Sequence, residues 1–157
     1  MNDGEHFTAL TGKDGGPTLQ KFSYKTGKPV AIITSAKAIR KATGKTVNFD
    51  AYQFSADEQR LLLGTQTEGI YRHSSKSYYY IYNLETQELD SLLTEGKQRL
   101  ADFSPTQNKV AYVHDNRMHI QDLENNTTQS FGTGEEDVFI AGAVDWVYEE
   151  EFSFHKG

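Results

Sequence analysis

The sequence contains no cysteine and only three prolines among its 157 residues. Without cysteine the chain can form no disulfide, thiol nucleophile or thiolate metal site. No run approaches the roughly 18 apolar residues that a membrane-spanning helix needs. Residues 1–5 lack the basic and apolar regions of a signal peptide. Lack of cysteine fits cytoplasm and periplasm equally, so composition leaves the compartment open.

Positive charge is also in deficit, with 16 lysines and arginines against 22 aspartates and glutamates, a net charge of -6. Because nucleic-acid affinity rests on neutralising phosphates with cations, we expect no nucleic-acid partner. The five histidines show no spacing typical of metal ligands. His114 and His119 would face opposite sides of one continuous strand. We therefore expect neither a metal nor a cofactor.

Aromatic residues and glycines are plentiful: nine tyrosines, nine phenylalanines and 13 glycines. This composition favours strands joined by tight turns. Period-two alternation dominates, and the run at 78–82 is predicted to be a strand with half of its rings buried. Only residues 35–42 have a helix-like composition, and a short helix and a polar loop are equally compatible with them. The predicted fold class is all-β.

The sequence contains internal repeats. Residues 54–63 resemble residues 103–112, 49 positions later, and residues 81–85 resemble residues 120–124, 39 positions later. A related strand-turn-strand unit occurs at 22–28. Repeats of roughly 40–50 residues made of short strands and polar turns are typical of β-propeller blades. The sequence therefore predicts part of a β-propeller with two to three four-stranded antiparallel blades.

The two offsets differ by ten residues, which places an insertion at 67–77, inside the first complete repeat. Insertions in repeat proteins usually map to loops on one face, which is often the binding face, and Arg72 lies in this one. The predicted divisions are a partial blade at 1–45, blades at 46–95 and 96–141, and a last segment at 142–157. So few blades cannot close a ring of 4–8.

The last segment contains three consecutive carboxylates, Glu149, Glu150 and Glu151, between aromatic residues. A run of charges is often only a solvated face, but Trp146, Tyr148 and Phe152 favour burial and would partly desolvate the acids. On a strand, Glu150 and Glu151 would point to opposite faces, so a shared ligand requires a helical or irregular backbone. Two converging carboxylates would bind a primary ammonium through charge-assisted hydrogen bonds.

Residues 145–152 resemble the D-W-V-Y-E-E-E motif of the dipeptidyl peptidase IV family. Residues 71–74 and 80–84 resemble its W-R-H-S and Y-D-I-Y-D-L stretches, and residues 103–113 resemble its W-S-P and K-L-A-Y-V stretches. The resemblance runs from about residue 48 to 154, and residues 1–7 resemble an early propeller segment. Tyr71 stands in place of the family's tryptophan, and Phe152 stands where valine is often found.

The resemblance implies that Glu150 and Glu151 bind the amino-terminal ammonium of a peptide and that Arg72 contacts the carbonyl of its first residue. Trp146, Tyr148 and His73 are candidate supports of the pocket. Glu149 is expected to be structural and paired with a nearby base. Anchoring the free amino end would restrict cleavage to the bond after the second residue, which is usually proline or alanine.

Family catalysis uses a Ser-Asp-His triad on an α/β-hydrolase domain that follows the propeller. The sequence has no Gly-x-Ser-x-Gly elbow, so we expect no catalytic residue in this chain and no activity of the chain alone. The implied partners are peptides with a free amino terminus, the hydrolase domain and a second copy in a homodimer. The implied location is periplasmic, secreted or cell-surface. The alternative is a non-catalytic propeller module whose acidic edge binds a protein or basic peptide.

Overall fold

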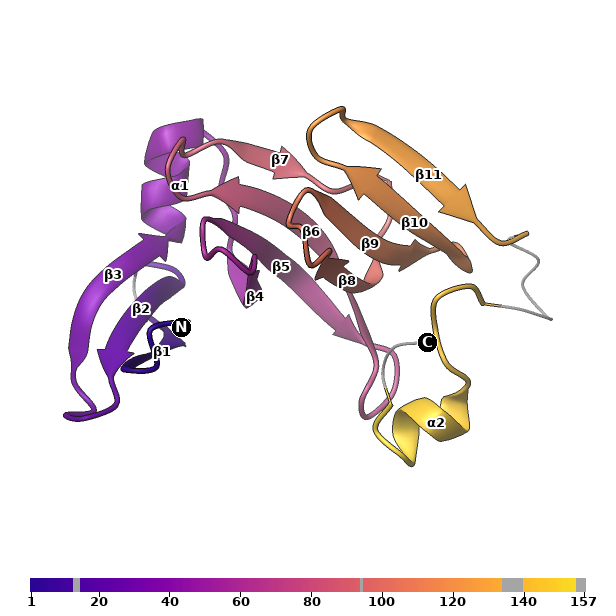
Figure 1. Cartoon of the computed structure of the whole chain (residues 1–157), viewed down its shortest axis with the longest axis horizontal. Helices are drawn as coiled ribbons and strands as arrows, with labels where there is room; N and C mark the ends of the chain where they lie inside the picture. Colours follow the sequence, from indigo (N-terminus) through magenta and orange to yellow (C-terminus); the bar gives the residue numbers. More distant parts are fainter. Residues whose placement is uncertain (13–14, 94, 134–139, 155–157) are drawn as a thin grey trace. The chain divides into compact units, whose positions relative to one another are not determined.

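The computed structural model describes residues 1–12, 15–93, 95–133 and 140–154. The chain divides into two compact units, whose strands and helices are labelled in Figure 1. The first comprises residues 1–66 and 80–90, and the second comprises residues 67–79 and 91–157.

The described residues form three antiparallel sheets, with strand orders β1-β2-β3, β4-β5-β6-β7 and β11-β10-β9-β8. The prediction of an all-β propeller fragment is confirmed. The strands of the first sheet are β1 (His6–Thr11), β2 (Thr18–Ser23) and β3 (Pro29–Ser35). Those of the second are β4 (Phe49–Phe54), β5 (Arg60–Gly69), β6 (Ser75–Asn83) and β7 (Leu89–Ser91). Those of the third are β8 (Arg99–Phe103), β9 (Lys109–His114), β10 (Arg117–Asp122) and β11 (Thr127–Phe131).

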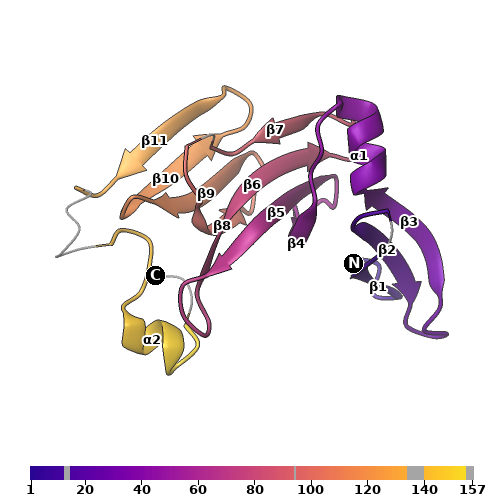
Figure 2. The ribbon, with the colours of Figure 1, turned by 180° about the vertical axis from the view of Figure 1, so that it is seen from behind.

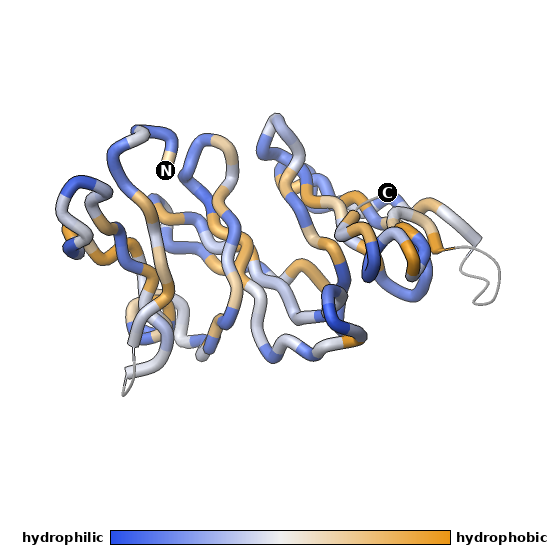
Figure 3. The backbone as a smooth tube through the Cα atoms, turned by 90° about the horizontal axis from the view of Figure 1, so that it is seen from below, coloured by the Kyte–Doolittle hydropathy of each residue, from blue (hydrophilic) through white to orange (hydrophobic). Residues whose placement is uncertain are grey.

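The repeated sequence patterns form matching turns. In the β4–β5 turn, Ser55 N–H donates to Arg60 O at 2.9 Å, and in the β8–β9 turn Ser104 N–H donates to Lys109 O at the same distance. The β6–β7 and β10–β11 turns are alike as well, because Asn83 Oδ1 and Asp122 Oδ1 each accept from the backbone amides two and three residues later. Such local acceptors stabilise turns independently of the rest of the fold. Figure 3 shows hydrophilic residues at many of the bends of the chain.

The undecided stretch at 35–42 is a helix, α1 (Ala36–Thr43) (Figure 2). Ser35 caps its start by accepting from Ala38 N–H, and Gly44 ends it in the left-handed conformation at φ 74°. Ile39 is fully buried. It joins the core of the first unit, whose other buried members include Leu19, Phe49, Leu61 and Leu63. The burial of Ile39 in this core stabilises α1, which is too short to be a stable helix by itself.

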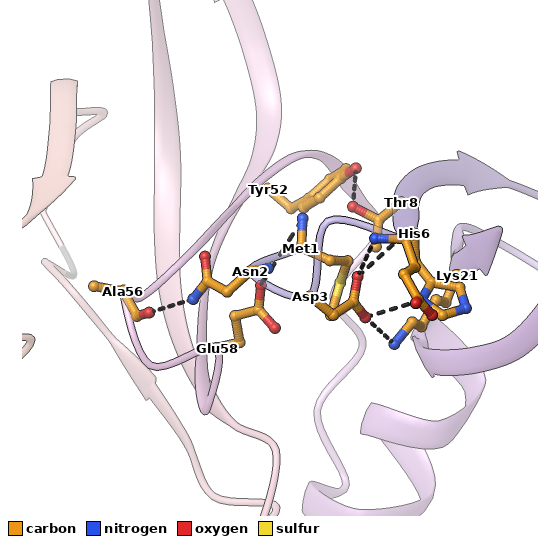
Figure 4. A network of polar contacts seen from close by, with 10 residues as sticks. Met1, Asn2, Asp3, His6, Thr8, Lys21, Tyr52, Ala56 and Glu58 are labelled. Carbon is orange, nitrogen blue, oxygen red and sulfur yellow. Dashed lines mark hydrogen bonds and ion pairs between the residues drawn. The ribbon is translucent and has the colours of Figure 1, made fainter. Parts of the chain in front are cut away.

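A polar network fastens the start of the first unit (Figure 4). The Asp3 carboxylate accepts from Lys21 Nζ at 2.8 Å and lies 2.9 Å from His6 Nδ1. Asn2 Nδ2 donates to Ala56 O at 2.7 Å. Residues next to β1 are thereby tied to β2 and to the β4–β5 turn.

Residues 67–77, predicted to be an inserted loop, mostly extend a hairpin. β5 continues to Gly69 and β6 begins at Ser75, which leaves a short turn closed by a 2.8 Å hydrogen bond from Ile70 N–H to Ser74 O. The extension forms because paired strands satisfy backbone groups that a loop would leave to solvent. Arg72 and His73 lie in the turn itself.

The spacing argument assumed that His114 and His119 share one continuous strand. They do not. Asp115 and Asn116 form a tight turn with φ 47° and 58°, so the two histidines lie on neighbouring strands with ring centroids 6.3 Å apart. Among the described residues no group of three or more histidine or acidic side chains is placed to hold a metal. In the same part of the chain, no helix is both long and apolar enough to cross a membrane.

Candidate functional site

The acidic motif lies on a short helix, α2 (Trp146–Glu150), as the requirement for a non-strand backbone predicted. Asp145 caps it: its Oδ1 accepts from Val147 N–H at 2.8 Å and from Tyr148 N–H at 3.2 Å. Gly142, three residues earlier, has φ 80°, a conformation that suits glycine and turns the chain into the helix. The motif's own aspartate therefore starts the helix that carries its glutamates.

On α2 the first two glutamates are buried, as expected, but the aromatic residues are not. Glu149 and Glu150 are buried, with 4% and 3% of their surface exposed, whereas Trp146, Tyr148 and Phe152 are 51%, 50% and 61% exposed. The expectation that these rings would be buried is wrong for the described residues. The two acids are buried because charged and polar donors of the second unit satisfy them. A supporting role for Trp146 and Tyr148 in a substrate pocket stays a prediction.

Glu150 is held by the turn between β5 and β6. His73 N–H lies 3.1 Å and 3.0 Å from its two carboxylate oxygens, and the Ser74 hydroxyl donates to Oε1 at 3.1 Å. Hydrogen bonds to an ionised acceptor are about twice as strong as neutral ones, which offsets the cost of burying the charge. His73 thus contributes through its backbone amide.

Arg72 meets the same helix from the turn. Its Nη2 donates to the main-chain carbonyl of Glu150 at 2.7 Å and lies 3.5 Å from Glu151 Oε1. The side chains of Arg72 and Glu151 are 64% and 53% exposed, so this ion pair is open to solvent and weak. The structure therefore brings together all three residues predicted to bind substrate.

Glu149 has the basic partner that was expected, and the partner is Arg99 at the start of β8. Arg99 Nη2 lies 2.9 Å and 2.8 Å from the two oxygens of the Glu149 carboxylate. Arg99 was not identified from the sequence, because 50 positions separate the two residues and no local pattern links them.

The site therefore offers an exposed carboxylate on Glu151, a fixed and buried carboxylate on Glu150, and an exposed guanidinium on Arg72. Such a set suits a ligand that carries a cationic group next to a hydrogen-bond acceptor.

Residues 55–157 match the family model described as the dipeptidyl peptidase IV (DPP IV) N-terminal region, which covers more than half of the chain. The chain belongs to this family. Within the DPP IV N-terminal region family, a probable dipeptidyl-aminopeptidase B from Sordaria macrospora is 38% identical over 101 residues, or 62% of this chain. The predicted family resemblance is confirmed.

Solved structures agree with this membership. The crystal structure of Porphyromonas gingivalis dipeptidyl peptidase 4 matches 99% of this chain with a TM-score of 0.82 and 31% identity. TolB from Acinetobacter baumannii matches 83% of the chain with a TM-score of 0.51 and 18% identity, which is a likeness of fold alone. The chain spans 11% of the Sordaria protein and 22% of the Porphyromonas chain.

Proposed function

We propose that this chain is the substrate-recognising segment of a serine-type dipeptidyl peptidase that releases X-Pro or X-Ala dipeptides. The observation that carries the proposal is the convergence of Arg72, Glu150 and Glu151, which come from the β5–β6 turn and α2. The names of the relatives, dipeptidyl-aminopeptidase and dipeptidyl peptidase 4, support the reaction class. The bond cleavage itself belongs to an α/β-hydrolase domain of the same protein.

The two glutamates bind the amino-terminal ammonium. Glu151 presents an exposed carboxylate, and Glu150 adds a second negative charge whose position is fixed by His73 N–H and Ser74 Oγ. An ionised carboxylate has about four lone-pair sites, so Glu150 keeps capacity for a further donor. An ammonium has three donors and can contact both acids, whereas an acetylated amine has lost its charge.

Arg72 receives the carbonyl of the first substrate residue. In the described part of the chain its hydrogen bond and its ion pair both use Nη2, so donors on Nη1 and Nε remain for a substrate. An acceptor there and an ammonium at the glutamates fix the peptide at its first residue. The site thereby acts as a ruler that places the bond after the second residue at the catalytic serine.

Further proposals concern the whole protein. We propose that it acts on peptides with a free amino terminus outside the cytoplasm, in the periplasm, secreted or at the cell surface, and that it forms a homodimer. If the gene encodes no hydrolase domain, the proposed enzymatic function is contradicted and the alternative, a non-catalytic binding module, is favoured.

The test uses the full-length protein and a chromogenic Gly-Pro substrate. We expect Glu150→Gln and Glu151→Gln each to lower kcat/KM by about tenfold or more, as loss of a hydrogen bond to a charged group does. Glu124→Gln, at the exposed β10–β11 turn, is the matched control and should leave turnover unchanged. Undiminished turnover in both site variants would refute the ammonium-binding role.

A further inference from the structure

The helix that carries Glu150, with Glu151 as its C-cap residue, has only five residues, so its position depends on what holds it. Helices this short are not stable by themselves in water. Successive helix residues point about 100° apart, so Glu149 and Glu150 reach out of α2 in different directions. Glu150 is fastened to the β5–β6 turn and Glu149 to Arg99. The helix is therefore held from two sides.

Arg99 is itself rigidly placed. The neighbouring Gln98 is fully buried and exchanges backbone hydrogen bonds of 2.9 Å and 2.8 Å with Ser77 on β6. The Gln98 side chain also accepts from Tyr79 N–H at 3.2 Å and donates to Gly96 O at 2.7 Å. Because β6 begins directly after the turn that holds Glu150, both anchors of α2 belong to one hydrogen-bonded frame.

The ion pair of Arg99 with Glu149 has the features of a geometric restraint. Only 5% of the Glu149 side chain and 20% of the Arg99 side chain are exposed. Within the described residues Arg99 Nε is buried without a hydrogen-bond partner, whereas Nη2 donates to both carboxylate oxygens of Glu149. Buried ion pairs add little net stability compared with apolar residues, but a single charge left behind is costly. Without Arg99, the Glu149 carboxylate would turn towards water and rotate α2.

We propose that Arg99 is a positioning residue of the substrate site, which it serves by fixing the rotation of α2 through Glu149. This inference rests on the proposed function of Glu150 and Glu151. It assigns a role to a residue outside the acidic motif and outside the β5–β6 turn. Loss of Arg99 leaves both ammonium-binding carboxylates in the protein but displaces them from the ammonium.

The experiment measures recognition of the ammonium and not activity alone. In the full-length protein, kcat and KM are determined for a dipeptide substrate and for its desamino analogue, in which hydrogen replaces the ammonium. The ratio of the two kcat/KM values is independent of the fraction of enzyme that folds. We expect Arg99→Gln to lower this ratio by about 10- to 100-fold, because a displacement of about 1 Å has effects of this size. The loss should appear mainly in KM.

Two further variants sharpen the test. Arg99→Lys keeps a cation that can contact both Glu149 oxygens, as the single Nη2 atom does, and should restore part of the ratio. Arg117→Gln removes an exposed arginine whose Nη2 donates to Thr133 O and not to a residue of α2, and it should leave the ratio unchanged.

The outcomes separate this inference from the function on which it rests. If Glu150→Gln and Glu151→Gln lower the ratio but Arg99→Gln does not, the positioning role is overturned and the ammonium site stands. An equal loss for both substrates in Arg99→Gln also overturns it, because the effect would then be general. If neither glutamate variant lowers the ratio, the proposed function fails and the inference fails with it.

Discussion

The Ser74 hydroxyl donates a 3.1 Å hydrogen bond to Glu150 Oε1 across 76 positions of sequence. Both residues are buried. Ser74 O also closes the β5–β6 turn by accepting from Ile70 N–H, so one residue shapes the turn and holds the acid.

Ser74→Ala should therefore destabilise the protein. The change removes a hydroxyl donor from a buried carboxylate, and we expect the free energy of unfolding to fall by about 1–3 kcal/mol. Denaturant unfolding measures this loss. Ser75→Ala, at the exposed neighbouring position, is the control. Equal stabilities of the two variants would show that the hydrogen bond contributes nothing.

Gly44→Ala tests the end of α1. Gly44 has φ 74°, and a Cβ there would meet no atom within 4 Å, so the cost of alanine is conformational and not steric. We expect a loss of about 1–2 kcal/mol in the free energy of unfolding. Asparagine tolerates this conformation better, so Gly44→Asn should cost less. An alanine variant as stable as the parent would contradict the left-handed cap.

Leu61→Ala tests the core of the first unit. Leu61 is fully buried beside Leu19 and Phe49. Its truncation removes apolar burial and leaves a cavity, which costs about 2–5 kcal/mol of unfolding free energy. Ile32→Ala, at a position that is 65% exposed on β3, should cost less than about 1 kcal/mol. Thermal or denaturant unfolding of the two variants gives the comparison.

The ionisation of Asp3 should make the stability of the folded protein depend on pH. The Lys21 ammonium, together with amide donors and His6, holds the pKa of the Asp3 carboxyl well below its ordinary value of 3.8. A lowered pKa stabilises the folded state above pH 3.8, and this contribution disappears as the pH falls further. Asp3→Asn should therefore be less stable than the parent near neutral pH, and the gap should narrow below pH 3.8. A gap that stays constant down to strongly acidic pH would exclude this carboxylate as its source.

Local chemistry explains what the sequence could predict. The matching turns depend on residues within a few positions, such as Asn83 and Asp122, so the repeats could be detected from residue types alone. The need for a non-strand backbone at Glu150 and Glu151 followed from strand alternation. The partner of Glu149 and the exposure of Trp146 could not be found in this way, because each depends on contacts between segments far apart in the sequence. The hairpin extension at 67–77 was missed because strand pairing replaced the expected loop.

Arg72 contacts Glu150 through the main-chain carbonyl and not through the carboxylate. Every amino acid at position 150 has that oxygen, so this hydrogen bond does not itself require a carboxylate side chain at position 150. The carbonyl recognition proposed for Arg72 therefore uses a main-chain contact that the variant Glu150→Gln keeps, whereas the proposed ammonium recognition uses the carboxylate that this variant removes.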